Sequence, residues 1–196
     1  LDGLAAIRAD LTWMTRRWGE LPEKAMFELR AISEDRQTQT AKFSVDWIDD
    51  AVDWATTVNK SGMNVYVVRN PIRASLTGSA EDPDIVAAFY LWADCDDAQA
   101  SANVKAFVGP KWTAAVVTGN TPTTRVHVYF ELNEPTYDMA AWRDMQTRIA
   151  AHLTGRQHSP ETIVADRATT PCFGMAWDIW LDLATAPKDT EVTFVA

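Results

Sequence analysis

Val86-Ala-Ala-Phe-Tyr-Leu-Trp-Ala-Asp94-Cys-Asp96-Asp97 begins with eight apolar residues and ends in three aspartates around one cysteine. An uninterrupted apolar run of this length is typical of a central strand buried on both faces. Side chains two apart in a strand point to the same face, so Asp94 and Asp96 should project together. Two such carboxylates repel each other unless a proton or a cation lies between them, and Mg²⁺ or Mn²⁺ prefers oxygen ligands. The stretch therefore predicts a metal-binding pair; the alternative is a solvated turn in which Asp96 or Asp97 caps the next helix.

Further along the chain, residues 113–118 and 125–132 have the pattern of a strand pair around a Gly- and Pro-containing loop. In the second strand Arg125, His127 and Tyr129 share one face, and the Val and Phe side chains share the other, which we expect to be core. A structural role is the commoner explanation for a single histidine. Here the neighbouring Arg125 and the preceding Thr118-Gly119-Asn120 favour contact with an anion such as a triphosphate.

A third acidic position, Asp166, follows the short apolar stretch 162–165 and precedes Arg167. An aspartate at the end of a strand is most often a turn residue. Asp166 is therefore evidence for a metal site only if it lies together with Asp94 and Asp96.

The rest of the chain predicts an α+β fold with a mixed, largely antiparallel sheet flanked by helices, because helical and strand patterns alternate only loosely. The predicted helices are 4–18, one that follows Ser44 and ends near Gly62, 98–107, and one from Pro135 to Gly155; the other predicted strands are 24–32, 63–68 and 191–195.

The composition is that of a globular domain, with 47% hydrophobic and 23% charged residues, and no apolar run approaches the roughly 20 residues of a membrane span. Two cysteines, Cys95 and Cys172, are too few for a disulfide framework, so we expect a reduced, cytoplasmic setting. Because the sequence does not begin with Met, we expect it to be a domain of a longer protein.

The net charge of −9 argues against a chain that grips DNA through a basic surface. Two explanations remain open. A metal-binding carboxylate cluster contributes several of these charges and is neutralised by its ions, or DNA is held by another domain.

Taken together, the three acidic and basic motifs resemble those of the archaeo-eukaryotic primase superfamily, and within it the primase-polymerases of phages and plasmids, including RepB-like primase domains. The resemblance spans residues 43–166. The matching stretches are Tyr90 to Asp96, Thr118-Gly119-Asn120 followed by Arg125 to Phe130, Ile163 to Arg167, and the turn Asn70-Pro71 upstream.

This resemblance implies an RRM-like catalytic core at residues 41–196, with an appended N-terminal helix and strand at 1–40. It implies a DNA-templated nucleotidyltransferase, a primase or DNA polymerase, in which Asp94, Asp96 and Asp166 hold Mg²⁺ or Mn²⁺. His127, Arg125, Thr118 and Gly119 would contact the nucleotide. Expected partners are nucleoside triphosphates, a single-stranded DNA template and a fused or associated helicase or helical priming domain, in the cytoplasm of a bacterial host of a phage or plasmid.

Two departures from the family pattern leave other functions open. Arg125 stands where a serine or another small residue is usual, and after Asp166 only Pro171 and Gly174 match the usual turn. A catalytically idle module tethered to a helicase would retain the fold without the chemistry. A metal-dependent nuclease would need the aspartates but no triphosphate-binding face.

Overall fold

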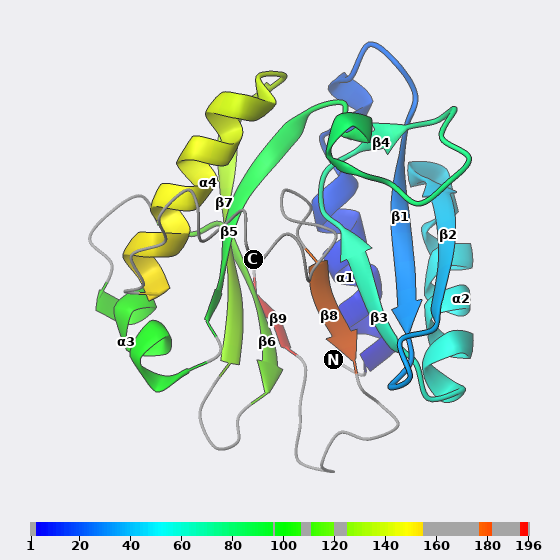
Figure 1. Ribbon diagram of the computed structural model, residues 1–196, viewed down its shortest axis with the longest axis horizontal. Helices are drawn as coiled ribbons and strands as arrows, with labels where there is room; N and C mark the ends of the chain where they lie inside the picture. The colour runs from blue at the N-terminus through cyan, green and yellow to red at the C-terminus, as the bar shows by residue number, and fades with distance from the viewer. Residues whose placement is uncertain are drawn as a thin grey trace.

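The computed structural model describes residues 3–95, 97–106, 111–119, 125–154, 177–181 and 193–195. In this part of the chain, two sheets of antiparallel strand pairs lie beside each other, with helices packed on their faces (Figure 1). The five-stranded first sheet has the order β2-β1-β3-β8, with β4 also paired to β1, and the four-stranded second sheet has the order β5-β7-β6-β9. The predicted α+β class with a largely antiparallel sheet is confirmed.

The first sheet is built around β1 (Ala25–Ile32), which pairs with β2 (Thr38–Ser44), β3 (Asn64–Val68) and the short β4 (Ile72–Arg73). On its far side β3 pairs with β8 (Trp177–Leu181). Helices α1 (Gly3–Thr15) and α2 (Ile48–Lys60) cover one face and share a buried core with Phe27, Leu29 and Ala31. Strand β1, which lies in the predicted N-terminal appendage of residues 1–40, thus pairs with three other strands of this sheet, and the predicted boundary at residue 40 stays a prediction.

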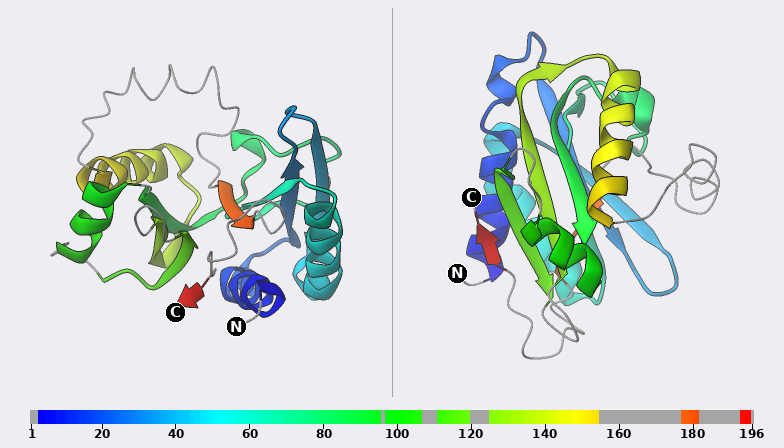
Figure 2. Two further views of the ribbon diagram at one scale, coloured as in Figure 1. Left: turned by 90° about the horizontal axis from the view of Figure 1, so that it is seen from below. Right: turned by 90° about the vertical axis from the view of Figure 1, so that its left-hand side faces the viewer.

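The second sheet has β7 (Arg125–Thr136) at its centre, between β5 (Ala88–Cys95) and β6 (Ala114–Gly119), and β9 (Thr193–Val195) pairs with β6. Figure 2 shows α3 (Ala98–Ala106) and α4 (Met139–Thr154) on the face that points away from the first sheet. Ala93, Ala115, Val128 and Leu153 form the core under these helices. The predicted Val and Phe face of β7 is thus core, as expected.

The observed elements differ from the predicted ones in a few places. Strand β5 continues through Asp94 to Cys95, so Asp94 lies in the strand rather than after it. The helix predicted at 4–18 ends at Thr15, and Trp18–Glu20 form a separate 3-10 turn, η1. Strands β2, β4 and β8 were not predicted. The strand predicted at 162–165 lies outside the described residues.

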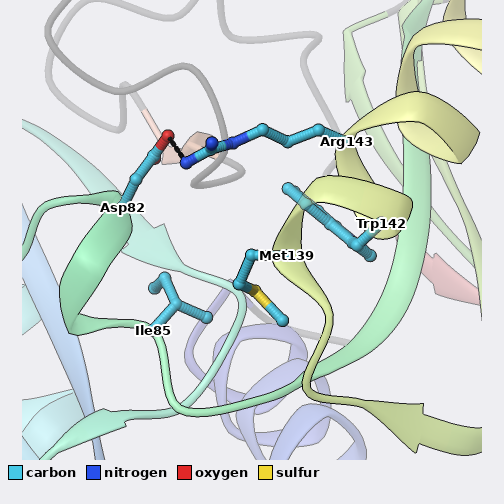
Figure 3. Close-up of a pocket in the computed structure, with 5 residues that line it drawn as sticks. All are labelled: Asp82, Ile85, Met139, Trp142 and Arg143. Atoms are coloured by element: carbon cyan, nitrogen blue, oxygen red, sulfur yellow. Dashed lines mark hydrogen bonds and ion pairs between the residues drawn. The ribbon is translucent and has the colours of Figure 1, made fainter.

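Among the described residues, ion pairs link the first sheet and its flanking elements to the second sheet and its helices at two places. At one junction Arg16 and Arg17, which directly follow α1, form ion pairs with Glu131 of β7. At the other, Asp82 of the 3-10 turn η3 (Asp82–Asp84) pairs with Arg143 of α4 at 2.5 Å. Figure 3 shows this second pair above a small hollow lined by Ile85, Met139 and Trp142. Ion pairs therefore link the two sheets and their helices at two separate places.

None of the described helices is both long and apolar enough to cross a membrane.

Candidate active site

Asp94 and His127 face each other across the pairing of β5 with β7. Directly opposed residues of an antiparallel pair lie on the same face of the sheet. His127 Nε2 lies 3.1 Å from Asp94 Oδ1, within hydrogen-bond distance. The imidazole is 3% exposed, whereas the carboxylate is 52% exposed. The carboxylate is thus open to solvent while one of its oxygens is held by a buried ring.

The face that carries His127 is more enclosed than the sequence predicted. Tyr129 is fully buried on it, Ala114 and Val116 lie opposite Tyr129 and His127 on β6, and Trp13 of α1 packs against this group. This face is enclosed because α1 packs over it. The alternation of side chains within β7 does not predict that packing. The second sheet is consequently buried on both faces from His127 to Phe130, and the half-buried Arg125 and the exposed Asp94 lie at the edge of this buried stretch.

Arg125 begins β7 on the same face as His127 and Tyr129, opposite Gly119 at the end of β6. Its side chain is half-buried. Its Nε is enclosed and makes no hydrogen bond to any described residue. A buried guanidinium nitrogen without a partner is costly, and an anion would satisfy it.

Asp97 has a local role that separates it from Asp94. Its Oδ1 accepts a hydrogen bond from the backbone N–H of Ala100 at 2.7 Å, which caps the first turn of α3. The capping alternative considered for Asp96 or Asp97 is therefore met by Asp97. Asp94 points instead toward His127.

No family model and no curated protein matches the sequence. Among solved structures, the archaeo-eukaryotic primase domain of the cyanophage S-2L primase-polymerase matches with a TM-score of 0.54 and 20% identity, over 77% of this chain and 72% of that one. The catalytic domain of the primase RepB′, solved with initiator DNA, matches with a TM-score of 0.55 and 11% identity, over 96% of this chain and 84% of that one. The chain has the fold of an archaeo-eukaryotic primase catalytic domain. At these identities the likeness shows the primase fold, and the chemistry rests on the residues themselves.

Within this primase fold, part of the predicted site can be placed. Asp94, His127 and Arg125 lie on one face of the second sheet. Thr118 and Gly119 are the last two residues of β6, and Gly119 pairs with Arg125. Asp96 and Asp166 lie outside the described residues. Among the residues that the structure describes, no group of three or more His, Cys, Asp or Glu side chains is gathered for a metal ion. The three-aspartate metal site therefore stays a prediction.

The structure adds a buried ion pair behind this face of the primase fold that the sequence did not reveal. Arg69, directly after β3, donates from Nη1 to Asp10 Oδ1 of α1 at 2.7 Å, and both side chains are buried. The guanidinium carbon also lies 4.6 Å from the ring centre of Tyr129. Burial raises the pKa of the Tyr129 hydroxyl; Arg69 opposes this, while the negative charges of Asp10 and Asp94 add to it. Tyr129 is therefore within electrostatic reach of both the ion pair and Asp94.

One signal in the sequence could have revealed Asp10. It lies three residues after Ile7 and four before Met14, on the apolar stripe of the predicted helix. A carboxylate on such a stripe requires a buried partner. Nothing comparable singles out Arg69, whose partners come from distant parts of the chain.

Proposed function

We propose that this chain is a DNA-templated nucleotidyltransferase, a primase or primase-polymerase, that works with Mg²⁺ or Mn²⁺. The observation that carries the proposal is the contact of Asp94 with His127 at the end of β5, in a chain with the primase fold. An exposed carboxylate that a buried imidazole holds in one orientation suits a site for a metal-bound nucleotide.

The residues present fit a hard divalent cation. The Asp94 carboxylate is half exposed at the end of its strand, and carboxylate oxygens are the ligands that Mg²⁺ and Mn²⁺ prefer. We propose that Asp96 and Asp166 complete the ligand set. When bound, such ions neutralise the triphosphate and lower the barrier to attack by a 3′-hydroxyl.

The roles of the chain's own residues follow from where they lie. His127 Nε2 would hold Asp94 in one orientation by donating to Oδ1, as hydrogen bonds around a metal site commonly do. We also propose that His127 and Arg125, with Thr118 and Gly119, contact the phosphates. Donors fixed in a buried setting stabilise developing charge without having to reorganise.

The proposed partners are nucleoside triphosphates and a single-stranded DNA template. The net charge of −9 makes a broad basic DNA-binding surface an unsuitable explanation for template binding. The structure of RepB′ contains initiator DNA, which favours a template groove within this fold. A helicase or a helical priming domain, fused or associated, would supply further contacts.

Nucleotide incorporation with and without a primer, measured with labelled nucleotides in Mg²⁺ and in Mn²⁺, tests the proposal. The parent chain should extend or start an oligonucleotide, and Asp94→Ala should remove at least nine tenths of this activity while the far-ultraviolet circular dichroism stays unchanged. Asp97→Asn is the matched control because asparagine also caps helices. Equal incorporation by Asp94→Ala and the parent refutes the assignment. Shortening of the oligonucleotide without triphosphates would instead identify a nuclease, and nucleotide binding without turnover in Mn²⁺ would identify an idle module.

A further inference from the structure

The ion pair between Asp10 and Arg69 joins three parts of the molecule at one buried point. Asp10 comes from α1, Arg69 follows β3 of the first sheet, and the ring beneath the guanidinium, Tyr129, belongs to β7 of the second sheet. Arg69 is 0% exposed and Asp10 is 3% exposed. The contact therefore lies at the junction of the two sheets, away from solvent.

Stability alone is a poor explanation for this pair. Removing two charges from water is expensive, and replacing a buried ion pair with apolar side chains is often neutral or stabilising. The neighbouring positions Leu11 and Met14 of α1 are fully buried and apolar, so the helix already packs well without charge. A buried pair at this point calls for a role that apolar side chains would not perform.

The position of Arg69 links it to the candidate active site. Tyr129 is two residues from His127 on the same face of β7, and His127 contacts Asp94. The next residue after Arg69, Asn70, accepts a hydrogen bond from the backbone N–H of Phe89 near the start of β5. Two adjacent residues thus contact both strands of the site: the ring beside His127 on β7, and the beginning of the strand that ends in Asp94.

We propose that Arg69, oriented by Asp10, is a positioning residue that fixes Tyr129 and thereby the relative placement of His127 and Asp94. The proposal rests on the function proposed above. A guanidinium suits this task because it is planar and permanently charged, so it can pair with a carboxylate and stack on a ring at once. Misplacement of Asp94 by a fraction of an ångström should lower turnover more than nucleotide affinity.

The test compares two pairs of substitutions that replace ion pairs with apolar side chains. The first is Asp10→Val with Arg69→Met. The matched control is Asp82→Val with Arg143→Met, which removes the ion pair between η3 and α4, two elements that carry none of the candidate-site residues (Figure 3). If Arg69 only stabilised the packing of the two sheets, both double variants would have the same effect on kcat. If it acts through Tyr129, only the first should affect catalysis.

For Asp10→Val with Arg69→Met we expect an unchanged melting temperature, a nucleotide Kd within threefold of the parent, and kcat lower by tenfold or more. The control should keep kcat within twofold. A kcat within twofold of the parent for the first double variant, or equal losses in both, overturns the proposal. Should the first variant not fold, Arg69→Lys decides, because it keeps the charge and loses the planar stack: kcat should fall severalfold, and an unchanged kcat overturns the proposal.

A second readout separates this proposal from the proposed function. Mn²⁺ binding, measured by calorimetry on folded protein, should weaken at least fivefold in the first double variant and stay unchanged in the control. If the parent incorporates no nucleotide, the proposed function fails, and this metal titration alone decides whether Arg69 positions Asp94. Equal Mn²⁺ affinity in the parent and the first double variant would then overturn the positioning role.

Discussion

The side-chain amide of Gln146 pairs with the backbone of Trp92 in the way a neighbouring strand would. Its Oε1 accepts from Trp92 N at 3.0 Å and its Nε2 donates to Trp92 O at 2.6 Å. Nearby, Trp142 Nε1 donates to the carbonyl of Tyr90 at 2.9 Å. Among the described strands β5 lies at the edge of the second sheet, so these contacts from α4 satisfy backbone groups that could otherwise pair with another strand. The strand that carries Asp94 is thus held from both sides.

Gln146→Ala should lower the free energy of unfolding by about 1–3 kcal/mol, because two partly buried backbone groups of Trp92 lose their partner. Denaturant titration measures this. Arg148→Ala, on the exposed side of the same helix, removes a solvated ion pair with Asp144 and should change stability by less than about 0.5 kcal/mol. If the two variants are equally stable, the amide does not protect the edge.

His127→Ala should weaken nucleotide binding more than it weakens Mn²⁺ binding, because the imidazole is proposed to contact phosphate directly and to act on the metal only by orienting Asp94. Titration of each ligand against the folded variant measures the difference. His152→Ala is the matched control, since His152 is exposed on α4. Unchanged nucleotide affinity would remove His127 from the site.

Alkaline titration should reveal tyrosines that ionise late. Burial raises the pKa of Tyr90 and of Tyr129 well above the ordinary value. A raised pKa in the folded state means that both hydroxyls contribute their full stability below about pH 10 and that this contribution is lost as the pH rises toward the folded-state pKa. Absorbance at 295 nm should therefore show a late component that coincides with unfolding. The component should shrink in Tyr90→Phe and in Tyr129→Phe; ionisation of all the tyrosines well before unfolding would contradict the burial argument.

Local patterns sufficed to predict β1, β3, the antiparallel pairing of β6 with β7, and the position of Asp94 at the end of an apolar strand. Strand β2 was missed because Thr38-Gln-Thr-Ala-Lys-Phe-Ser has no apolar alternation; it is a strand because it pairs with β1 along its whole length. Strand β8 was missed because its partner, β3, is more than a hundred residues away in the sequence. Pairing between distant segments is not encoded in a local period.

The same limit applies to the candidate site. The sequence predicts Asp94 at the end of one strand and His127 within another. It does not predict that β5 and β7 pair in the register that places these two residues opposite each other. It also gives no indication that α1 covers the face of His127, or that Arg69 lies over Tyr129. These contacts depend on how two sheets and a helix meet, and that is decided by packing across the whole chain.

The turn between β1 and β2 contains the only described non-glycine residue with a positive φ, Arg36 at 65°. A side chain in this left-handed region costs about 1 kcal/mol, which glycine avoids at the expense of a more flexible unfolded state. Arg36→Gly should therefore raise the free energy of unfolding by about 0.5 kcal/mol, measured by denaturant titration. The same change at Glu34, which lacks a positive φ, should lower it. Destabilisation by Arg36→Gly would mean that the side chain of Arg36 supports the turn.

Substitutions at Asp97 separate the helix cap from the metal site. Asp97→Ala removes the acceptor for the Ala100 N–H and should lower the free energy of unfolding by about 1 kcal/mol, whereas Asp97→Asn should restore most of it. Incorporation of nucleotides, measured where each variant is fully folded, should be unaffected by either change, because the carboxylate of Asp97 is committed to α3. Asp94→Asn should show the reverse pattern, with little change in stability and loss of incorporation. Loss of incorporation in Asp97→Asn would instead assign Asp97 to the metal site. If Asp94→Asn then kept its activity, the contact of Asp94 with His127 would have only a structural role.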